Sequence, residues 1–325
     1  MKPFRHFNAH SVDEAASLMA GYDGKACIMA GGTDLLVKMK DRILPSYPEA
    51  LVNIKTIPGL DAIREEGGVL RIGALARLSS VAAHPVVLSK YRALAEAAGR
   101  TASPQLRNMG TIGGNLCQDI RCWYYRGPGN RFSCLRKGGG RCYALKGDNR
   151  FHSIFGGSVE KGCVAVHPSD TAPALIALGA SVVTSRRTIN AEQFFNVRLN
   201  GTTVLEPGEI VTEIRIPEPP EGTRSAFLKF ALRKAIDFPI VNCAASLAFD
   251  HEQVASARIC LNAVHVVPRR VTGAEQMLQG RIIADGVAGE AAVYTSDAAE
   301  ALARNAYMVQ VAWTLVKRSI LACGG

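Results

Sequence analysis

Thr111-Ile112-Gly113-Gly114-Asn115 is a short glycine turn bounded by two polar residues. An earlier turn of this kind, Gly31-Gly32-Thr33-Asp34, lies between a short apolar run and a helix-like pattern, and in chain order it is the first turn and Thr111–Asn115 the second. A strand, a glycine turn and a helix N-terminus together place backbone N–H groups and a helix dipole where they favour an anion. Neither turn matches the Rossmann fingerprint or the P-loop, so each alone is a weak signal. Together they predict a diphosphate held between two loops.

Four cysteines follow the second turn, at Cys122, Cys134, Cys142 and Cys163. Residues 123–162 have few β-branched side chains and little periodicity, which predicts mostly irregular backbone. A structureless loop of this length is unusual in a compact domain unless a ligand folds it. The spacing has no C-x-x-C pair, so zinc, an iron–sulfur cluster and free thiols all remain open on spacing alone. We expect a metal–thiolate site, because core packing does not explain this clustering.

The composition is that of a globular protein large enough for two or three domains, with 325 residues. The formal charge is +10, but the basic residues are scattered, and no recognition helix is evident. This favours a solvated basic face or a docking surface for acidic partners over nucleic-acid binding. We expect no membrane segment and a cytoplasmic location, unless a partner carries an export signal, since neither a bilayer-length apolar run nor a signal peptide is evident.

The expected secondary structure is a mixture of strands and helices with a linker at residues 217–222. A capping-box pattern starts the first helix at Ser11. Helices are expected at residues 11–21, 35–39, 86–98, 171–178 and 305–323. Strands are expected at residues 26–30, 51–54, 69–75, 163–166, 180–185, 209–216, 226–232, 240–249 and 255–263. Strands followed by helices after the linker indicate an α+β fold.

Several motifs occur in an order that carries a family resemblance. They are Ala30–Leu35, Thr111–Leu116, Asp170, Glu209-Ile210-Val211, Lys229 and Arg233 through Pro239. The order resembles the FAD-binding medium subunit of molybdenum hydroxylases, the xanthine oxidase and CO dehydrogenase family, over essentially the whole chain. The resemblance implies an α+β, two-subdomain FAD-binding domain of the vanillyl-alcohol-oxidase (PCMH) type, followed by a C-terminal α/β domain like that of the CO dehydrogenase flavoprotein. The implied divisions are residues 1–57, 58–220 and 221–325, with an iron–sulfur insertion at 117–165.

The resemblance also implies which residues hold FAD. Both glycine turns are expected at the diphosphate and ribose, and Asp170 at the flavin nucleotide. Lys229 is expected near the isoalloxazine ring, Phe238 over it, and Val211 against it through an apolar backbone position. The complete expected set is Met29, Ala30, Gly31, Gly32, Thr33, Asp34, Leu35, Leu36, Thr111, Gly114, Asn115, Asp170, Val211, Lys229 and Phe238. No catalytic residue is expected on this chain.

The cysteine segment resembles a minority branch of the family. Flavoprotein subunits of 4-hydroxybenzoyl-CoA reductase and periplasmic aldehyde oxidoreductase are similar in Asp119-Ile120-Arg121-Cys122 and in residues 163–170. In that branch the inserted cysteines bind an additional 4Fe–4S cluster. The resemblance therefore implies that Cys122, Cys134, Cys142 and Cys163 ligate such a cluster. Cys117, directly after the second turn, is expected to be structural.

The implied function is electron transfer rather than substrate chemistry. The resemblance places a molybdenum cofactor on a large partner and two 2Fe–2S clusters on a small partner, in a heterotrimer that dimerises. An acidic, ferredoxin-like partner is expected to dock on the basic loop at Arg136, Lys137 and Arg141. The alternatives are a stand-alone FAD-dependent oxidase and a zinc-stabilised basic module. Aromatic acyl-CoA, aldehyde, purine and other N-heterocycles all remain open as substrates of the complex.

Overall fold

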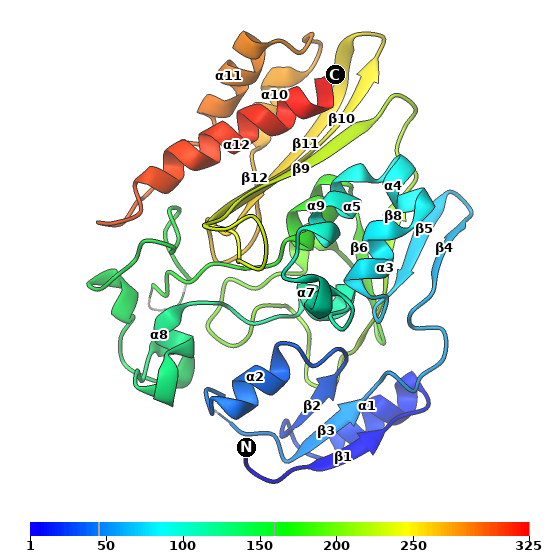
Figure 1. The fold of residues 1–325 in the computed structure, drawn as a ribbon, viewed down its shortest axis with the longest axis vertical. Helices are drawn as coiled ribbons and strands as arrows, with labels where there is room; N and C mark the ends of the chain where they lie inside the picture. The colour runs from blue at the N-terminus through cyan, green and yellow to red at the C-terminus, as the bar shows by residue number, and fades with distance from the viewer. Residues whose placement is uncertain (45, 159, 161, 325) are drawn as a thin grey trace.

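A computed structural model describes residues 1–44, 46–158, 160 and 162–324 of the chain. Over these residues the chain forms three sheets that follow one another along the sequence, each with its own helices. Figure 1 shows the N-terminal sheet at one end of the molecule and the C-terminal sheet at the other. The predicted α+β class is confirmed. Within the described chain, no helix combines the length and apolar character that a bilayer crossing requires.

The N-terminal unit is a parallel three-stranded sheet with two helices. Its strand order is β1-β3-β2, with β1 (Arg5–Asn8), β2 (Ala26–Met29) and β3 (Ala50–Asn53). The helices are α1 (Val12–Ala20) and α2 (Leu35–Lys40). The Ser11 side chain accepts a hydrogen bond from the Glu14 N–H at 3.0 Å, which confirms the predicted helix start. The first glycine turn joins β2 to α2, as the sequence pattern predicts.

The middle unit is an antiparallel five-stranded sheet covered by short helices. The strand order is β4-β5-β8-β6-β7. The strands are β4 (Ile63–Glu66), β5 (Val69–Gly73), β6 (Ser181–Thr184), β7 (Thr188–Asn190) and β8 (Val211–Pro217). The helices are α3 (Leu78–Ala83), α4 (Pro85–Lys90), α5 (Arg92–Gly99), α6 (Pro104–Arg107), α7 (Ile112–Leu116) and α9 (Thr171–Ala177).

The single helix predicted at residues 86–98 is wrong, because the chain breaks at Tyr91 into α4 and α5. Tyr91 has φ −127° and ψ 47°, outside the helical region. Its side chain is fully buried in the core of the middle unit. We attribute the break to this burial, which outweighs the helix propensity of the flanking residues.

The C-terminal unit is an antiparallel sheet of order β12-β11-β10-β9. Its strands are β9 (Arg224–Phe230), β10 (Val241–Asp250), β11 (Gln253–Asn262) and β12 (Arg269–Arg270). Its helices are α10 (Thr272–Leu278), α11 (Asp285–Val293) and α12 (Tyr307–Gly324), and α12 runs across the sheet (Figure 1). The opposite face of the sheet packs on α5 and α9 of the middle unit.

The cysteine segment extends from the side of the molecule as mostly irregular backbone, as predicted (Figure 1). It contains α8 (Trp123–Arg126) and three 3-10 turns, η1 (Pro128–Asn130), η2 (Leu135–Lys137) and η3 (Tyr143–Leu145). The strand predicted at residues 163–166 is wrong. Single hydrogen bonds from Ser158 N–H to the Cys163 carbonyl and from Ser153 N–H to the Val164 carbonyl replace a strand ladder.

Phe227 fills the contact between the C-terminal sheet and the middle unit. Its fully buried side chain packs among five alanines, which are Ala93, Ala97, Ala174, Ala177 and Ala244. Because these neighbours are too small to close over a missing ring, Phe227→Ala should lower the free energy of unfolding by about 3–5 kcal/mol. Chemical denaturation measures this loss. Phe230→Ala, on the exposed end of the same strand, is the control, and an equal loss there would contradict the assignment.

Candidate functional site

A cavity of about 590 Å³ lies where the N-terminal and middle units meet. Both glycine turns line it, and most of its wall is apolar. Of the residues predicted to hold FAD, the structure places eleven on this wall: Ala30, Gly31, Gly32, Thr33, Asp34, Leu35, Thr111, Gly114, Asn115, Val211 and Phe238. Residues from distant parts of the sequence thus share one cavity, open enough and apolar enough for a ring-bearing nucleotide.

The first glycine turn approaches the backbone that leads into the second turn at Gly31. A Cβ atom on Gly31 would lie 2.1 Å from the Met109 carbonyl oxygen and 3.1 Å from the Gly110 Cα. Gly32 has φ +72°, in the left-handed region that favours glycine. The first turn therefore needs glycine at position 31 for the close approach to Met109 and at position 32 for the left-handed backbone.

The second turn is fixed by side-chain hydrogen bonds. Thr111 caps α7 by accepting from the Gly114 N–H at 3.1 Å. Asn115 Oδ1 accepts from the Ser169 hydroxyl at 2.5 Å and from the Thr171 hydroxyl at 2.7 Å. These bonds anchor the turn to the start of α9. They therefore join the residue just before the cysteine segment to residues just after it.

Asp170 and Lys229 are not among the residues that line the cavity, and they form a buried ion pair. Lys229 Nζ is 2.7 Å from Asp170 Oδ2, and Asn242 Nδ2 donates to Asp170 Oδ1 at 2.8 Å. Burial raises the pKa of Asp170, while Lys229 opposes that rise. Met29 and Leu36 are also absent from the described wall. A direct flavin contact for these four residues stays a prediction.

The structure adds cavity residues that sequence reasoning missed. Lys38 and Arg121 present cations to the wall, and Cys27 and Glu209 also face it. Cys27 is half-buried, because its strand β2 borders the cavity. The signal for Lys38 was its position one turn after Asp34 on α2. Arg121 lies 87 positions after Asp34 of the first turn, so no local pattern indicates it.

The four predicted ligand cysteines lie together. Cys134 and Cys163 belong to a buried apolar cluster with Ile120 and Tyr125, and Cys122 and Cys142 pack against it. The neighbouring Cys142 thiol and the Arg136 guanidinium lower the pKa of Cys163 despite its burial. The only other cysteine of the segment, Cys117, is exposed and lines the cavity instead. The structure therefore places Cys117 apart from the group of four.

The geometry of this cysteine group does not fit a single metal ion. Among the described residues, no three His, Cys, Asp or Glu side chains are arranged to hold one ion. A zinc tetrathiolate needs its sulfurs within about 4 Å of one another, given Zn–S bonds of about 2.3 Å. A 4Fe–4S cluster takes one thiolate per iron, so it accommodates four sulfurs that lie farther apart than those around one zinc ion. His152 Nε2 also lies 3.2 Å from Cys122 Sγ, at the edge of the group.

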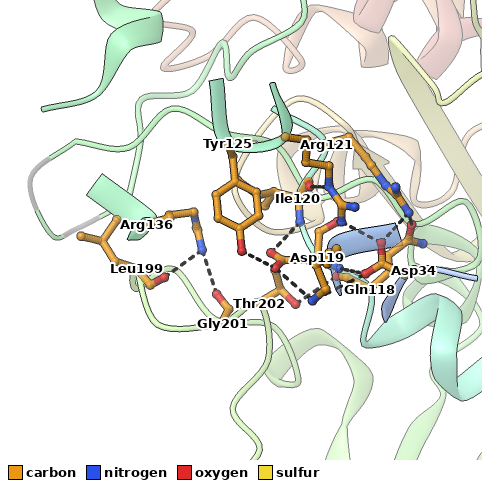
Figure 2. Close-up of polar contacts among 12 residues, drawn as sticks. Asp34, Gln118, Asp119, Ile120, Arg121, Tyr125, Arg136, Leu199, Gly201 and Thr202 are labelled. Atoms are coloured by element: carbon orange, nitrogen blue, oxygen red, sulfur yellow. Dashed lines mark hydrogen bonds and ion pairs between the residues drawn. The ribbon is translucent and has the colours of Figure 1, made fainter. Parts of the chain in front are cut away.

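Arg136 is part of this cysteine group, not of the protein surface. Its guanidinium is buried and donates to the carbonyls of Leu199 at 3.1 Å and Gly201 at 2.9 Å (Figure 2). Its Nε lies 3.4 Å from Cys163 Sγ. The expected docking role of Arg136 is therefore wrong, because burial removes it from any partner. Arg141 is exposed and Lys137 half-buried.

Comparisons with known proteins agree with this architecture. Residues 2–219 match the FAD binding domain in molybdopterin dehydrogenase, and residues 226–323 match the CO dehydrogenase flavoprotein C-terminal domain. The FAD-binding subunit PaoB of an aldehyde oxidoreductase from Escherichia coli (strain K12) is 36% identical over 290 residues, covering 86% of this chain and 87% of that protein. The carbon monoxide dehydrogenase medium chain from Hydrogenophaga pseudoflava is 31% identical over 325 residues, covering 98% and 96%.

A solved structure of carbon monoxide dehydrogenase from Hydrogenophaga pseudoflava superposes with a TM-score of 0.77 at 28% identity, covering 99% of this chain and 97% of that chain. The fold and the paired glycine turns define an FAD-binding flavoprotein. The chain belongs to the family of FAD-binding subunits of molybdopterin dehydrogenases, and it is an oxidoreductase component.

Gly31→Ala should weaken FAD binding by at least about tenfold, equivalent to about 1.4 kcal/mol. The reason is that a new methyl group must push the Met109 carbonyl away and separate the two turns. Fluorescence titration of the FAD-depleted full-length chain measures the affinity. Gly289→Ala on α11, where a Cβ meets no atom within 4 Å, should leave it unchanged. Unaltered affinity in Gly31→Ala would show that the cavity does not need this close approach.

Glu209 on the cavity wall gives a pH-dependent prediction. Burial acts to raise its pKa, but hydrogen bonds from Arg187 and from the Glu206 N–H lower it to about 2. This carboxylate therefore stabilises the fold above its ordinary pKa of 4.5, and the contribution is lost as the pH falls toward 2.

Glu209→Gln should cost about 1–2 kcal/mol near pH 7, a modest figure because Arg187 is partly exposed. The difference from wild type should persist at pH 5 and shrink below it, as measured by denaturant unfolding at several pH values. Glu206→Gln, at an exposed ion pair with Arg186, is the matched control. A difference that grows with acidity would contradict the assignment.

Proposed function

We propose that this chain is the FAD-binding, electron-transfer subunit of a molybdenum-containing hydroxylase or dehydrogenase complex. The observation that carries the proposal is the cavity that both glycine turns line, near a group of four cysteines. FAD supplies one- and two-electron transfer when it is bound. The residues of this chain bind the cofactor, orient it and exclude water from it.

The wall of the cavity suits the two ends of FAD differently. Backbone N–H groups of the glycine turns, with the cations of Lys38 and Arg121, favour the diphosphate. Apolar residues, among them Val211 and Phe238, suit the ring system. The Arg121 guanidinium carbon lies 4.4 Å from the centre of the Phe238 ring, within range of a cation–π contact.

We further propose that Cys122, Cys134, Cys142 and Cys163 hold an additional 4Fe–4S cluster. Their shared position supports this, as does the buried Arg136 cation beside Cys163, since a cluster with four thiolates is anionic. The lack of a single-ion site in the described chain weighs against the zinc-stabilised module. The cluster would connect FAD with an external partner.

The proposed partners are a large subunit with the molybdenum cofactor and a small subunit with two 2Fe–2S clusters. Support comes from relatives named as a medium chain and as an FAD-binding subunit, which are names for parts of complexes. The assembly is placed in the cytoplasm, or in the periplasm if a partner carries an export signal. An acidic, ferredoxin-like protein would meet the exposed basic residues Arg131, Arg141 and Lys146.

A stand-alone oxidase is not favoured by the cavity. Substrate oxidation on the chain itself calls for a side chain free to accept a proton. The carboxylates on the described wall are Asp34 and Glu209, and both are bonded to arginines. Neither is free for that role.

The cofactor content of the anaerobically purified subunit tests the proposal. We expect one FAD and about four irons with sulfide per chain, one iron for each thiolate. Cys134→Ser should lose iron and keep FAD, because Cys134 lies in the apolar cysteine group. Cys117→Ser, outside that group, should keep its iron. FAD with one zinc, or FAD without metal, would refute the cluster, and a chain that binds no FAD would refute the flavoprotein assignment.

A further inference from the structure

The carboxylate of the first glycine turn is bonded mainly by the start of the cysteine segment. Asp34 Oδ1 lies 2.8 Å from an Arg121 guanidinium nitrogen and 2.7 Å from one of Arg126. Asp34 Oδ2 accepts the Asp119 N–H at 3.0 Å. Figure 2 shows Arg121 and Asp119 beside Asp34. A residue on the FAD cavity wall is thus held by residues that flank Cys122.

The Asp119 side chain also connects the cysteine segment to the helix that follows the first glycine turn. Its Oδ2 accepts from the Tyr125 hydroxyl at 2.7 Å and lies 3.2 Å from Lys38 Nζ on α2 (Figure 2 shows the Tyr125 bond). Its Oδ1 accepts the Ile120 N–H at 2.9 Å. Its backbone therefore binds the turn, and its side chain binds both the helix after the turn and the helix that carries Tyr125. The side chains of Lys38 and Asp119 are only 15% and 16% exposed, so solvent screens this contact weakly.

A second set of bonds reaches the other end of the cysteine group. The Thr202 hydroxyl donates to the Gln118 carbonyl at 3.1 Å, one residue before Asp119. The neighbouring Gly201 carbonyl accepts from Arg136, whose Nε contacts Cys163 Sγ (Figure 2 shows the Gly201 bond). Residues 118 and 119 are therefore connected to the surroundings of Cys122 on one side and of Cys163 on the other.

We propose that Asp119 is a positioning residue that couples occupancy of the FAD cavity to order in the cysteine segment. When FAD fixes the turn that ends at Asp34, the bonds of Asp119 hold residues 119–126, and with them Cys122, in one arrangement. The coupling rests on the proposed function in one respect, which is that the cavity binds FAD. Linkage makes it reciprocal, so order in the cysteine group strengthens FAD binding by the same factor.

Hydrogen exchange of the full-length chain, with and without FAD, tests the coupling. In the wild type, FAD should slow exchange of the amides of residues 119–126 by at least about fivefold, the lower end of usual coupling energies. Asp119→Asn should still bind FAD but lose most of that slowing. A merely structural role would speed exchange equally in both states and leave the FAD-dependent ratio unchanged.

Asp148→Asn is the matched control, because Asp148 lies in the same segment but pairs with the exposed Arg150. It should keep the wild-type ratio. Tyr125→Phe removes a single bond to Asp119 and should reduce the ratio partly, and it decides the question if Asp119→Asn does not fold. A wild-type ratio in both Asp119→Asn and Tyr125→Phe would overturn the coupling, as would wild-type protein that binds FAD without any slowing. Wild-type protein that binds no FAD would refute the proposed function and the coupling with it.

Discussion

The contact between the Gly31 backbone and the Met109 carbonyl is the constraint on which the cofactor site depends. It lets a turn of the parallel sheet meet a turn of the antiparallel unit without an intervening side chain. Residues of both turns line the cavity on either side of this contact. Each unit has its own core, yet neither alone provides both halves of the wall.

Burial governs the charged groups around this contact. Asp34, Asp119, Lys38, Arg121 and Arg126 lie close together with little solvent access, and each finds an opposite charge. Burial alone would raise the pKa of Asp119, but Lys38, the Tyr125 hydroxyl and Arg126 outweigh it and lower the pKa. Removing one partner from such a set leaves another charge buried without compensation. The three cations exceed the two carboxylates, which suits a wall that faces an anionic cofactor.

The sequence predicted those parts of the fold that local chemistry determines. The Ser11 cap, the turns at Gly31 and Gly113 and the long C-terminal helix follow from capping, backbone freedom and periodicity. The break at Tyr91 and the irregular backbone at residues 163–166 depend on burial against distant segments, which no local window contains. The same reason explains the error at Arg136, a residue in a basic run whose side chain turns inward to backbone carbonyls. Arg121 was missed as a cavity residue because its partner Asp34 is 87 positions away.

The hydrogen bond from Ser169 to Asn115 has a consequence for how such a chain changes during evolution. It joins the two ends of residues 116–168, so the cysteine segment is a closed loop that begins and ends beside the cavity. Lengthening or shortening such a loop leaves the strand order of all three sheets unchanged. Doubling its length costs only about 0.6 kcal/mol in closure entropy. Ile154 and Phe155, however, belong to the core of the C-terminal unit, and Asp119, Arg121 and Arg126 bond the cavity residue Asp34. The segment can therefore change length at its exposed turns, but its two ends remain part of the framework of the fold.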